Sequence, residues 1–233
     1  MKLNVQHTTQ YDYAQEVFHS IQYLRLTPQT SARQQVNFWQ LQMPEQASWG
    51  IDSFGNIQHV LTLDKPHTAI SITATGEVEL NPELNEQPDN LSPYIFLRDT
   101  PMTIANSAIR KFSRAFKGHH DLRQIKDLSQ ALLQEMPYTV GATEGTFTAS
   151  QAFDAKRGVC QDHTHVMLSC CRELGIPARY VSGYLYTDDS AHVASHAWAE
   201  VWLNNHWQMV DVSNQLYTPS HHIKLAVGFD YLD

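Results

Sequence analysis

The sequence predicts an α+β protein in which an N-terminal antiparallel β-sandwich or meander is followed by helices and then by further strands. Three observations support this class. The first eighty residues hold runs rich in β-branched and aromatic residues, divided by turn signals. Apolar residues recur at helical spacing after residue 100. Strand-like runs then return after residue 177.

The N-terminal strands are bounded by proline and glycine turns, such as Thr27-Pro28 and Lys65-Pro66. Ile70, Ile72 and Ala74 alternate with hydroxyl side chains, which is the pattern of a half-buried strand. We expect strands at residues 2–13, 19–29, 35–43, 57–64 and 69–80.

Residues 81–93 are polar and carry three prolines, so we expect a linker there. The predicted organisation is a β-rich domain over residues 1–80 and a core over residues 94–233. Thr100-Pro101 resembles a helix N-cap followed by proline at the first helical position. A second helix is expected to start near Asp121 and to end before a proline.

The last part of the core is expected to hold one longer helix and three strands. The helix opens at Cys160 and ends at Gly175-Ile-Pro177. The strands are expected at residues 179–186, 196–203 and 206–212.

Composition limits the possible partners and the location. The net charge is −8 and the sequence has no Lys/Arg-rich run, so nucleic acid is not expected as a partner. No stretch approaches the ~18 apolar residues of a membrane span, and the N-terminus lacks the apolar region of a secretory signal.

Cys170 lies ~15 Å from Cys160 along a helix, too far for a disulfide. Cys171 adjoins Cys170, and adjacent cysteines rarely bridge each other. Three free thiols favour a cytoplasmic location. The oligomeric state is not indicated.

Cys160 is the candidate nucleophile. Free N–H groups and the helix dipole stabilise a thiolate at a helix N-terminus, and Cys160 occupies that place. Gly158 permits close approach of a substrate, and the Cys160 N–H can contribute to an oxyanion hole. The neighbouring Gln161 is either a second oxyanion donor or a capping residue. The alternative for Cys160 is a buried structural thiol.

A hairpin argument brings a base and a carboxylate together. If Asn204 and Asn205 form a two-residue turn, Trp198 lies opposite Asp211. His196 shares the face of Trp198 and is then the diagonal neighbour of Asp211, within reach of a hydrogen bond. Such a bond fixes the imidazole tautomer and leaves the other ring nitrogen for a thiol.

Residues 138–215 resemble the core of the transglutaminase-like superfamily of papain-like cysteine enzymes. The similarity lies in G-V-C-Q-D, R-Y-V-S-G-Y, S-H-A-W-A-E-V-W and W-x-x-x-D. Residues 1–80, with D-S-F-G-N at 52–56, are similar to the β-rich N-terminal region of bacterial transglutaminase-like proteins. The resemblance implies a papain-like core of helices packed on an antiparallel sheet, a triad of Cys160, His196 and Asp211, and no cofactor.

The chain departs from this family at its end. Relatives commonly continue after a segment like VGFDYLD with another strand, and they carry Arg where Phe229 stands. This chain stops at Asp233, which indicates a shortened family member or a truncated form.

Other residues near Cys160 admit two interpretations. His163 and His165 raise the alternative of a metal site, but a second ligand pair at zinc spacing is missing, so none is expected. Asp162 is expected to complement the helix dipole, with a substrate amine or a loop as the alternative. Trp198 is a sheet-packing residue that also shares the catalytic face and can line the cleft.

The reaction implied is acyl transfer through a thioester, on a peptide or protein substrate. Hydrolysis by a protease or amidase is the first expectation, and cross-linking to a primary amine is the second. A catalytically silent peptide-binding module is the alternative of another class. The sequence shows no calcium-loop pattern, so calcium activation has no support.

Overall fold

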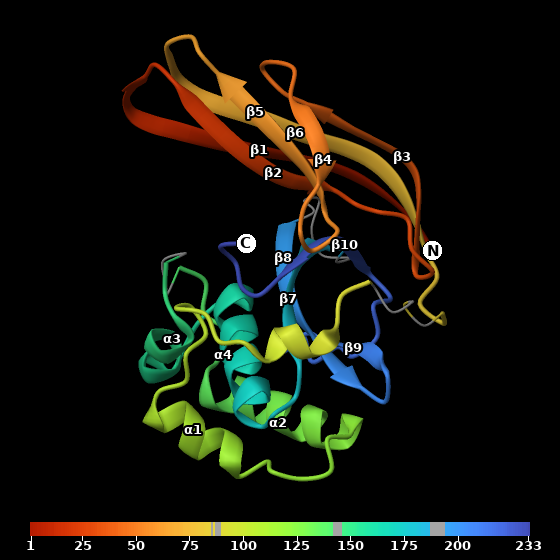
Figure 1. Ribbon diagram of the computed structural model, residues 1–233, viewed down its shortest axis with the longest axis vertical. Coiled ribbons are helices and arrows are strands. Elements are labelled where there is room, and N and C mark those ends of the chain that lie inside the picture. The colour runs from red at the N-terminus through yellow and green to blue at the C-terminus, as the bar shows by residue number, and fades with distance from the viewer. Residues whose placement is uncertain (85, 87–89, 142–145, 187–193) are drawn as a thin grey trace. The chain divides into compact units, whose positions relative to one another are not determined.

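The computed structural model describes all residues except 85, 87–89, 142–145 and 187–193, and it divides into two compact units (Figure 1). The first unit comprises residues 1–84, 183–195 and 220–226. The second comprises residues 85–182, 196–219 and 227–233. Part of the linker expected at 81–93, namely residues 85 and 87–89, lies outside the described residues.

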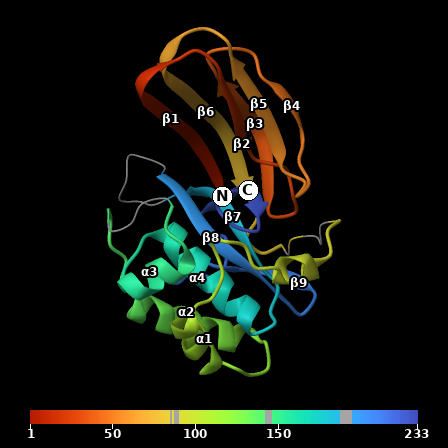
Figure 2. The same cartoon turned by 60° about the vertical axis from the view of Figure 1, so that its left-hand side comes forward.

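The first unit contains two three-stranded antiparallel sheets, with strand orders β1-β6-β3 and β2-β5-β4 (Figure 2). This arrangement confirms the sandwich-like part of the predicted α+β fold. The strands are β1 Lys2–Val17, β2 Ser20–Thr27, β3 Gln34–Gln42, β4 Ser48–Ile51, β5 Ile57–Leu63 and β6 His67–Leu80. The sequence did not predict β4, which has only four residues, all of them exposed.

Strand β6 forms the centre of this unit because its apolar residues alternate strictly. Ile70, Ile72, Ala74, Val78 and Leu80 are all at most 2% exposed and lie at every second position except 76, which is glycine, while the residues that alternate with them are Ser, Thr or Glu. Burying each of the Ile, Val and Leu side chains contributes roughly 1.5–3 kcal/mol. The alternation therefore fixes which face of β6 meets the core.

Trp39 of β3 ties the two sheets of the first unit together. Its indole N–H donates a hydrogen bond to the Leu26 carbonyl of β2 over 2.9 Å. The ring occupies the space beside Gly76, where a Cβ atom would lie 2.1 Å from the Trp39 ring. Glycine at position 76 is therefore required by the tryptophan.

The second unit contains helices and most of a four-stranded sheet with the order β10-β7-β8-β9. Helix α4 is its centre, because eleven of its fourteen residues are buried. Its helices are the 3-10 helix η1 Pro93–Leu97, α1 Ser107–Arg114, α2 Leu122–Glu135, α3 Ala149–Ala155 and α4 Cys160–Glu173. The strands of the sheet are β7 Ala178–Leu185, β8 Ala194–Leu203, β9 His206–Val210 and β10 His222–Gly228, of which residues 183–185, 194–195 and 222–226 count toward the first unit.

The predicted helix start at Thr100-Pro101 is wrong. The Thr100 carbonyl accepts hydrogen bonds from the backbone N–H groups of residues 103 and 104, which closes a single turn. Helix α1 begins six residues later, where the Asn106 side chain accepts from the Ile109 N–H over 2.9 Å. The second predicted start is right, since Asp121 caps α2 through the Gln124 N–H at 2.8 Å.

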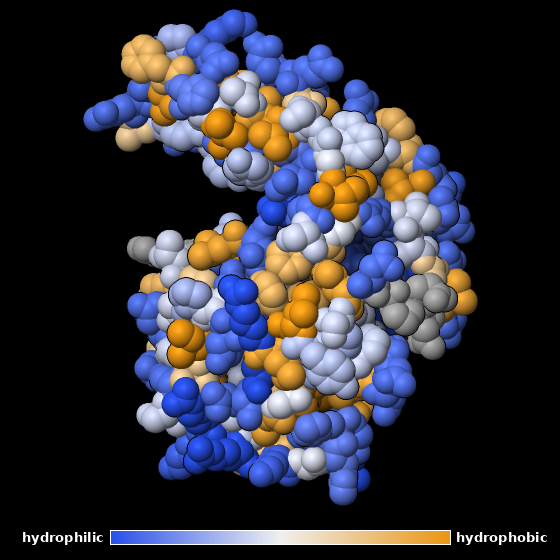
Figure 3. Space-filling model, in the orientation of Figure 1, coloured by the Kyte–Doolittle hydropathy of each residue, from blue (hydrophilic) through white to orange (hydrophobic). Residues whose placement is uncertain are grey.

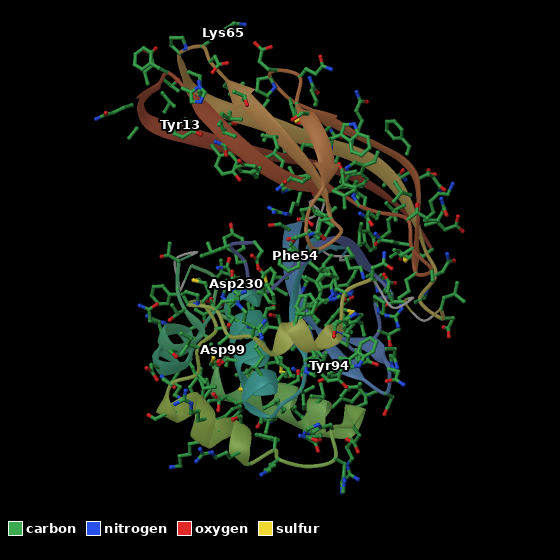
Figure 4. All side chains as sticks on the ribbon, in the orientation of Figure 1. Tyr13, Phe54, Lys65, Tyr94, Asp99 and Asp230 are labelled. Carbon is green, nitrogen blue, oxygen red and sulfur yellow. The ribbon has the colours of Figure 1, made fainter. Side chains whose placement is uncertain are left out.

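Arg172 of α4 joins four segments of the second unit. Its buried guanidinium donates to the carbonyls of Phe96, Ala178 and Phe229 and to the Thr103 hydroxyl. Burial lowers the pKa of Arg172 to about 10, although the nearby carboxylates of Asp99 and Asp230 act to raise it. Figure 4 labels both aspartates. The side chain therefore stays charged at neutral pH and fixes the C-terminal segment to α4.

Among the described helices, none is both long enough and apolar enough to cross a bilayer. Large apolar side chains that remain exposed include Tyr23 on β2, Phe38 on β3 and Trp49 on β4. Figure 3 shows hydrophobic residues on the surface of the first unit, scattered among hydrophilic ones.

Candidate active site

The candidate nucleophile Cys160 is the first residue of α4 and is half-buried. Asp162 fixes this helix start, because its Oδ2 atom accepts a hydrogen bond from the Val159 N–H at 2.8 Å. Asp162 is only 1% exposed. Its capping bond and its burial support the helix-terminus role and leave little surface for a substrate amine.

Gly158 permits this close packing. A Cβ atom at position 158 would lie 2.6 Å from Cβ of Asp162 and 2.9 Å from its Oδ2 atom. Real side chains do not approach so closely, so any larger residue displaces the capping carboxylate. Gly158 therefore shapes the start of the Cys160 helix, in addition to the substrate access that the sequence predicts.

The hairpin of β8 and β9 has the predicted register. Leu203 pairs with His206 around a two-residue turn. Asn204 and Asn205 have φ angles of +48° and +63°, the left-handed conformation that a type I′ turn requires. The ladder ends at the pair formed by residues 199 and 210. Asp211 therefore bridges to Leu216 instead of pairing with residue 198.

The hydrogen bond that this register predicts is present. Nε2 of His196 lies 2.7 Å from Oδ2 of Asp211. The His196 side chain is 9% exposed and the Asp211 side chain is fully buried. Since Nε2 faces the carboxylate, Nδ1 is the ring nitrogen that remains for a thiol.

Cys160 provides that second partner for His196. Burial lowers the pKa of His196, but hydrogen bonds to Asp211 and to Cys160, with the charges of both groups, raise it from 6.5 to about 9. The imidazole is therefore protonated at neutral pH. An imidazolium next to a thiol favours the thiolate, which is the reactive form of cysteine.

Two further predicted residues lie next to this group. Trp198 is 2% exposed, and its ring stacks on the His196 ring at a centroid distance of 6.2 Å. It packs against Val181 and Met209, so it supports the imidazole from within the protein. Gln161 is the second residue of α4 and is half-buried.

The histidines of α4 bind protein groups. Nε2 of His163 donates to the Met136 carbonyl at 2.8 Å, and Nδ1 lies 2.9 Å from the Ser213 hydroxyl. Nε2 of His165 accepts from the Tyr231 N–H at 3.2 Å. Burial lowers the pKa of His163 and lowers that of His165 to about 4. Both rings are therefore neutral packing and hydrogen-bonding groups.

The other two thiols lie in the core. Cys170 and Cys171 are fully buried, and burial raises both pKa values, that of Cys171 to about 12. Neither side chain forms a thiolate at neutral pH. Cys160 is the one cysteine of the three that combines exposure with a basic partner.

Sequence reasoning missed two residues near this group. The Asn214 side chain donates to Oδ2 of Asp211 over 2.8 Å. Tyr138 is half-exposed, and its pKa is raised by burial and then by the charges of Cys160 and Asp211. Asn is common in turns and Tyr138 follows a proline, so neither position carried a recognisable signal.

A thiol at the start of a buried helix, with an imidazole and a carboxylate from an adjacent hairpin, is the arrangement of papain-like proteins. Comparison with family models agrees with this class. Residues 3–79 match the bacterial transglutaminase-like N-terminal region, and residues 110–212 match the transglutaminase-like superfamily. The chain belongs to the transglutaminase-like superfamily.

Similar proteins cover the whole chain. A solved structure from Cytophaga hutchinsonii, whose description proposes a cysteine protease, superposes with a TM-score of 0.79 at 20% identity, over 100% of this chain and 83% of that one. An uncharacterized protein of Mycobacterium leprae is 29% identical over 257 residues, covering 100% of this chain and 90% of the relative. An uncharacterized protein of Mycobacterium tuberculosis is 28% identical over 266 residues, covering 100% and 85%. The structural likeness shows the fold.

Proposed function

We propose that this protein is a cysteine-dependent hydrolase that cleaves peptide or amide bonds through a thioester intermediate. Cys160 is the nucleophile, His196 the acid and base, and Asp211 the residue that orients the imidazole. The observation that carries the proposal is the hydrogen bonding of His196 to both Asp211 and Cys160. In this proposal residues 94–233 are the catalytic core and residues 1–80 a β-rich accessory domain.

The geometry supports a two-step mechanism. The Cys160 thiolate attacks the substrate carbonyl, and the carbonyl electron pair moves to oxygen to form a tetrahedral oxyanion. N–H groups at the start of α4 have no partner within the helix, so the Cys160 N–H is suited to stabilise this charge. As the oxyanion collapses, the C–N bond breaks and the His196 imidazolium gives its proton to the leaving amine.

Deacylation uses the same groups in reverse. Neutral His196 takes a proton from water, which attacks the thioester, and the C–S bond then breaks to release the acid and the Cys160 thiolate. A primary amine in place of water would give transamidation. The description of the Cytophaga protein favours hydrolysis, and we extend that preference to this chain. The three free cysteines support a cytoplasmic location.

A peptide library, incubated with and without a labelled primary amine, tests the reaction. Cys160→Ser serves as the control, and intact mass spectrometry detects an acyl group on the protein. Cleavage that depends on Cys160 is the expected result. Incorporation of label without cleavage would assign a transglutaminase instead. Peptide binding without cleavage, label or acyl-enzyme would indicate a catalytically silent module.

A further inference from the structure

We infer that Asn214 is a positioning residue for this site: it holds the Asp211 carboxylate in the rotation that directs Oδ2 at His196. The inference rests on the proposed function. Two groups of Asn214 bind the carboxylate, since the side-chain Nδ2 donates to Oδ2 at 2.8 Å and the backbone N–H donates to Oδ1 at 3.2 Å. Both carboxylate oxygens are therefore held by one residue.

The position of Asn214 is set by a closed loop. The N–H of Asp211 donates to the Leu216 carbonyl at 2.9 Å, and the N–H of Leu216 donates back to the Asp211 carbonyl at 3.1 Å. Between them Gln215 adopts φ +54°, and its amide donates to the backbone and hydroxyl of Ser129 on α2. The loop is thereby attached to α2 and held in one conformation.

A second attachment joins the loop to the nucleophile's own helix. Ser213, the neighbour of Asn214, lies 2.9 Å from Nδ1 of His163, and His163 sits three residues after Cys160 on α4. The loop that orients Asp211 is therefore held in place relative to the helix that carries the thiol. A rigid supporting group of this kind is what a catalytic constellation requires.

The charge on Asp211 explains why such a residue is needed. The side chain is fully buried, so its carboxylate depends on protein donors where an exposed one would use water. Oδ2 accepts from Nε2 of His196 at 2.7 Å and from Nδ2 of Asn214 at 2.8 Å, and the two nitrogens are 3.4 Å apart. Without the side-chain amide, Oδ2 loses one of these two donors, and the carboxylate is held less firmly in the rotation that faces the imidazole.

Alkylation of Cys160 by iodoacetamide tests the inference on the full chain without a known substrate. Asn214→Leu keeps the size of the side chain and removes its donor, and Asn214→Ala removes the side chain. At pH 6.5 we expect both variants to react about 10- to 100-fold more slowly than wild type, the range of a hydrogen bond to a charged group. At high pH, where any thiol is ionised, the rates converge.

Two measurements separate positioning from simple stability. Gln130→Leu makes the same change at an exposed amide of α2 and should leave the rate unchanged. Imidazole NMR should show the pKa of His196 lower in Asn214→Leu than in wild type. A wild-type rate and a wild-type His196 pKa in both Asn214 variants would overturn the inference, even with a lowered melting temperature. If His196→Ala itself leaves the wild-type rate unchanged, the proposed function fails instead.

Discussion

Nε2 of His196 lies 2.7 Å from Oδ2 of Asp211, although the two residues are 15 positions apart in the sequence. The two side chains meet because a two-residue turn sets the pairing of β8 with β9. Side chains alternate between the faces of a strand, so one extra residue in the turn would move Asp211 to the other face. The candidate chemistry therefore depends directly on the conformation of Asn204 and Asn205.

The turn makes a direct prediction about stability. Asn205 has φ +63°, which glycine adopts freely and β-branched residues do not. We expect Asn205→Val to lower the free energy of unfolding by about 1–2 kcal/mol. Asn205→Gly is the matched control and should be within ~0.5 kcal/mol of wild type. Urea denaturation measures both, and equal stabilities of the two variants would contradict the predicted turn.

The raised pKa of His196 predicts how stability varies with pH. The folded-state pKa of about 9 lies above the ordinary value of 6.5, so protonated His196 stabilises the fold. This contribution is fully present below pH 6.5 and is lost as the pH rises through about 9. Its magnitude is about 3 kcal/mol at most.

Urea unfolding of wild type and His196→Gln at pH 6, 7.5 and 9.5 tests this dependence. The advantage of the wild type should shrink across that range. His119→Gln removes an exposed histidine and serves as the control. An advantage that grows with pH would show that the imidazole is neutral in the folded protein.

Burial predicts which thiols react. In the native protein iodoacetamide should modify Cys160 alone, because Cys170 and Cys171 are fully buried and their pKa values are raised. In concentrated urea all three should react. Peptide mass mapping after timed labelling distinguishes the sites. Native labelling of Cys171 at the rate of Cys160 would disprove the assigned core position.

Gly158 should tolerate no side chain. In Gly158→Ala the new methyl group collides with Asp162 and breaks its bond to the Val159 N–H. We expect a loss of about 1–3 kcal/mol, the usual cost of overpacking, with slower alkylation of Cys160. Gly50→Ala is the control, since a Cβ atom at position 50 would have open space around it. Equal losses of stability in Gly158→Ala and Gly50→Ala would contradict the claim that a side chain at position 158 collides with Asp162.

Much of the core was predictable because its signals are local. The helix from Cys160 follows from its apolar spacing and its glycine end, and α2 follows from the Asp121 cap. The hydrogen bond between His196 and Asp211 needed only strand alternation and a turn length. Each of these features is determined by residues close to one another in the sequence.

Other features depend on distant contacts and were not predictable. Strand β4 has four exposed residues and no alternation, so only its pairing with β5 defines it. Strand β10 carried no recognisable pattern at His222. Thr100-Pro101 has the residue types of a helix start, yet the Thr100 carbonyl closes a single turn that does not continue as a helix. The contact of Asn214 with Asp211 depends on the closed loop, whose shape the residue types do not reveal.

The most direct test of the central claim is the rate of Cys160 alkylation at pH 6.5 in wild type and in His196→Ala, with circular dichroism to confirm folding. If His196 forms an ion pair with the thiolate, wild type should react at least about tenfold faster than the variant. The two rates should converge at high pH. Equal rates for wild type and His196→Ala at pH 6.5, with both proteins folded, would contradict the assignment of Cys160 and His196 as a catalytic pair.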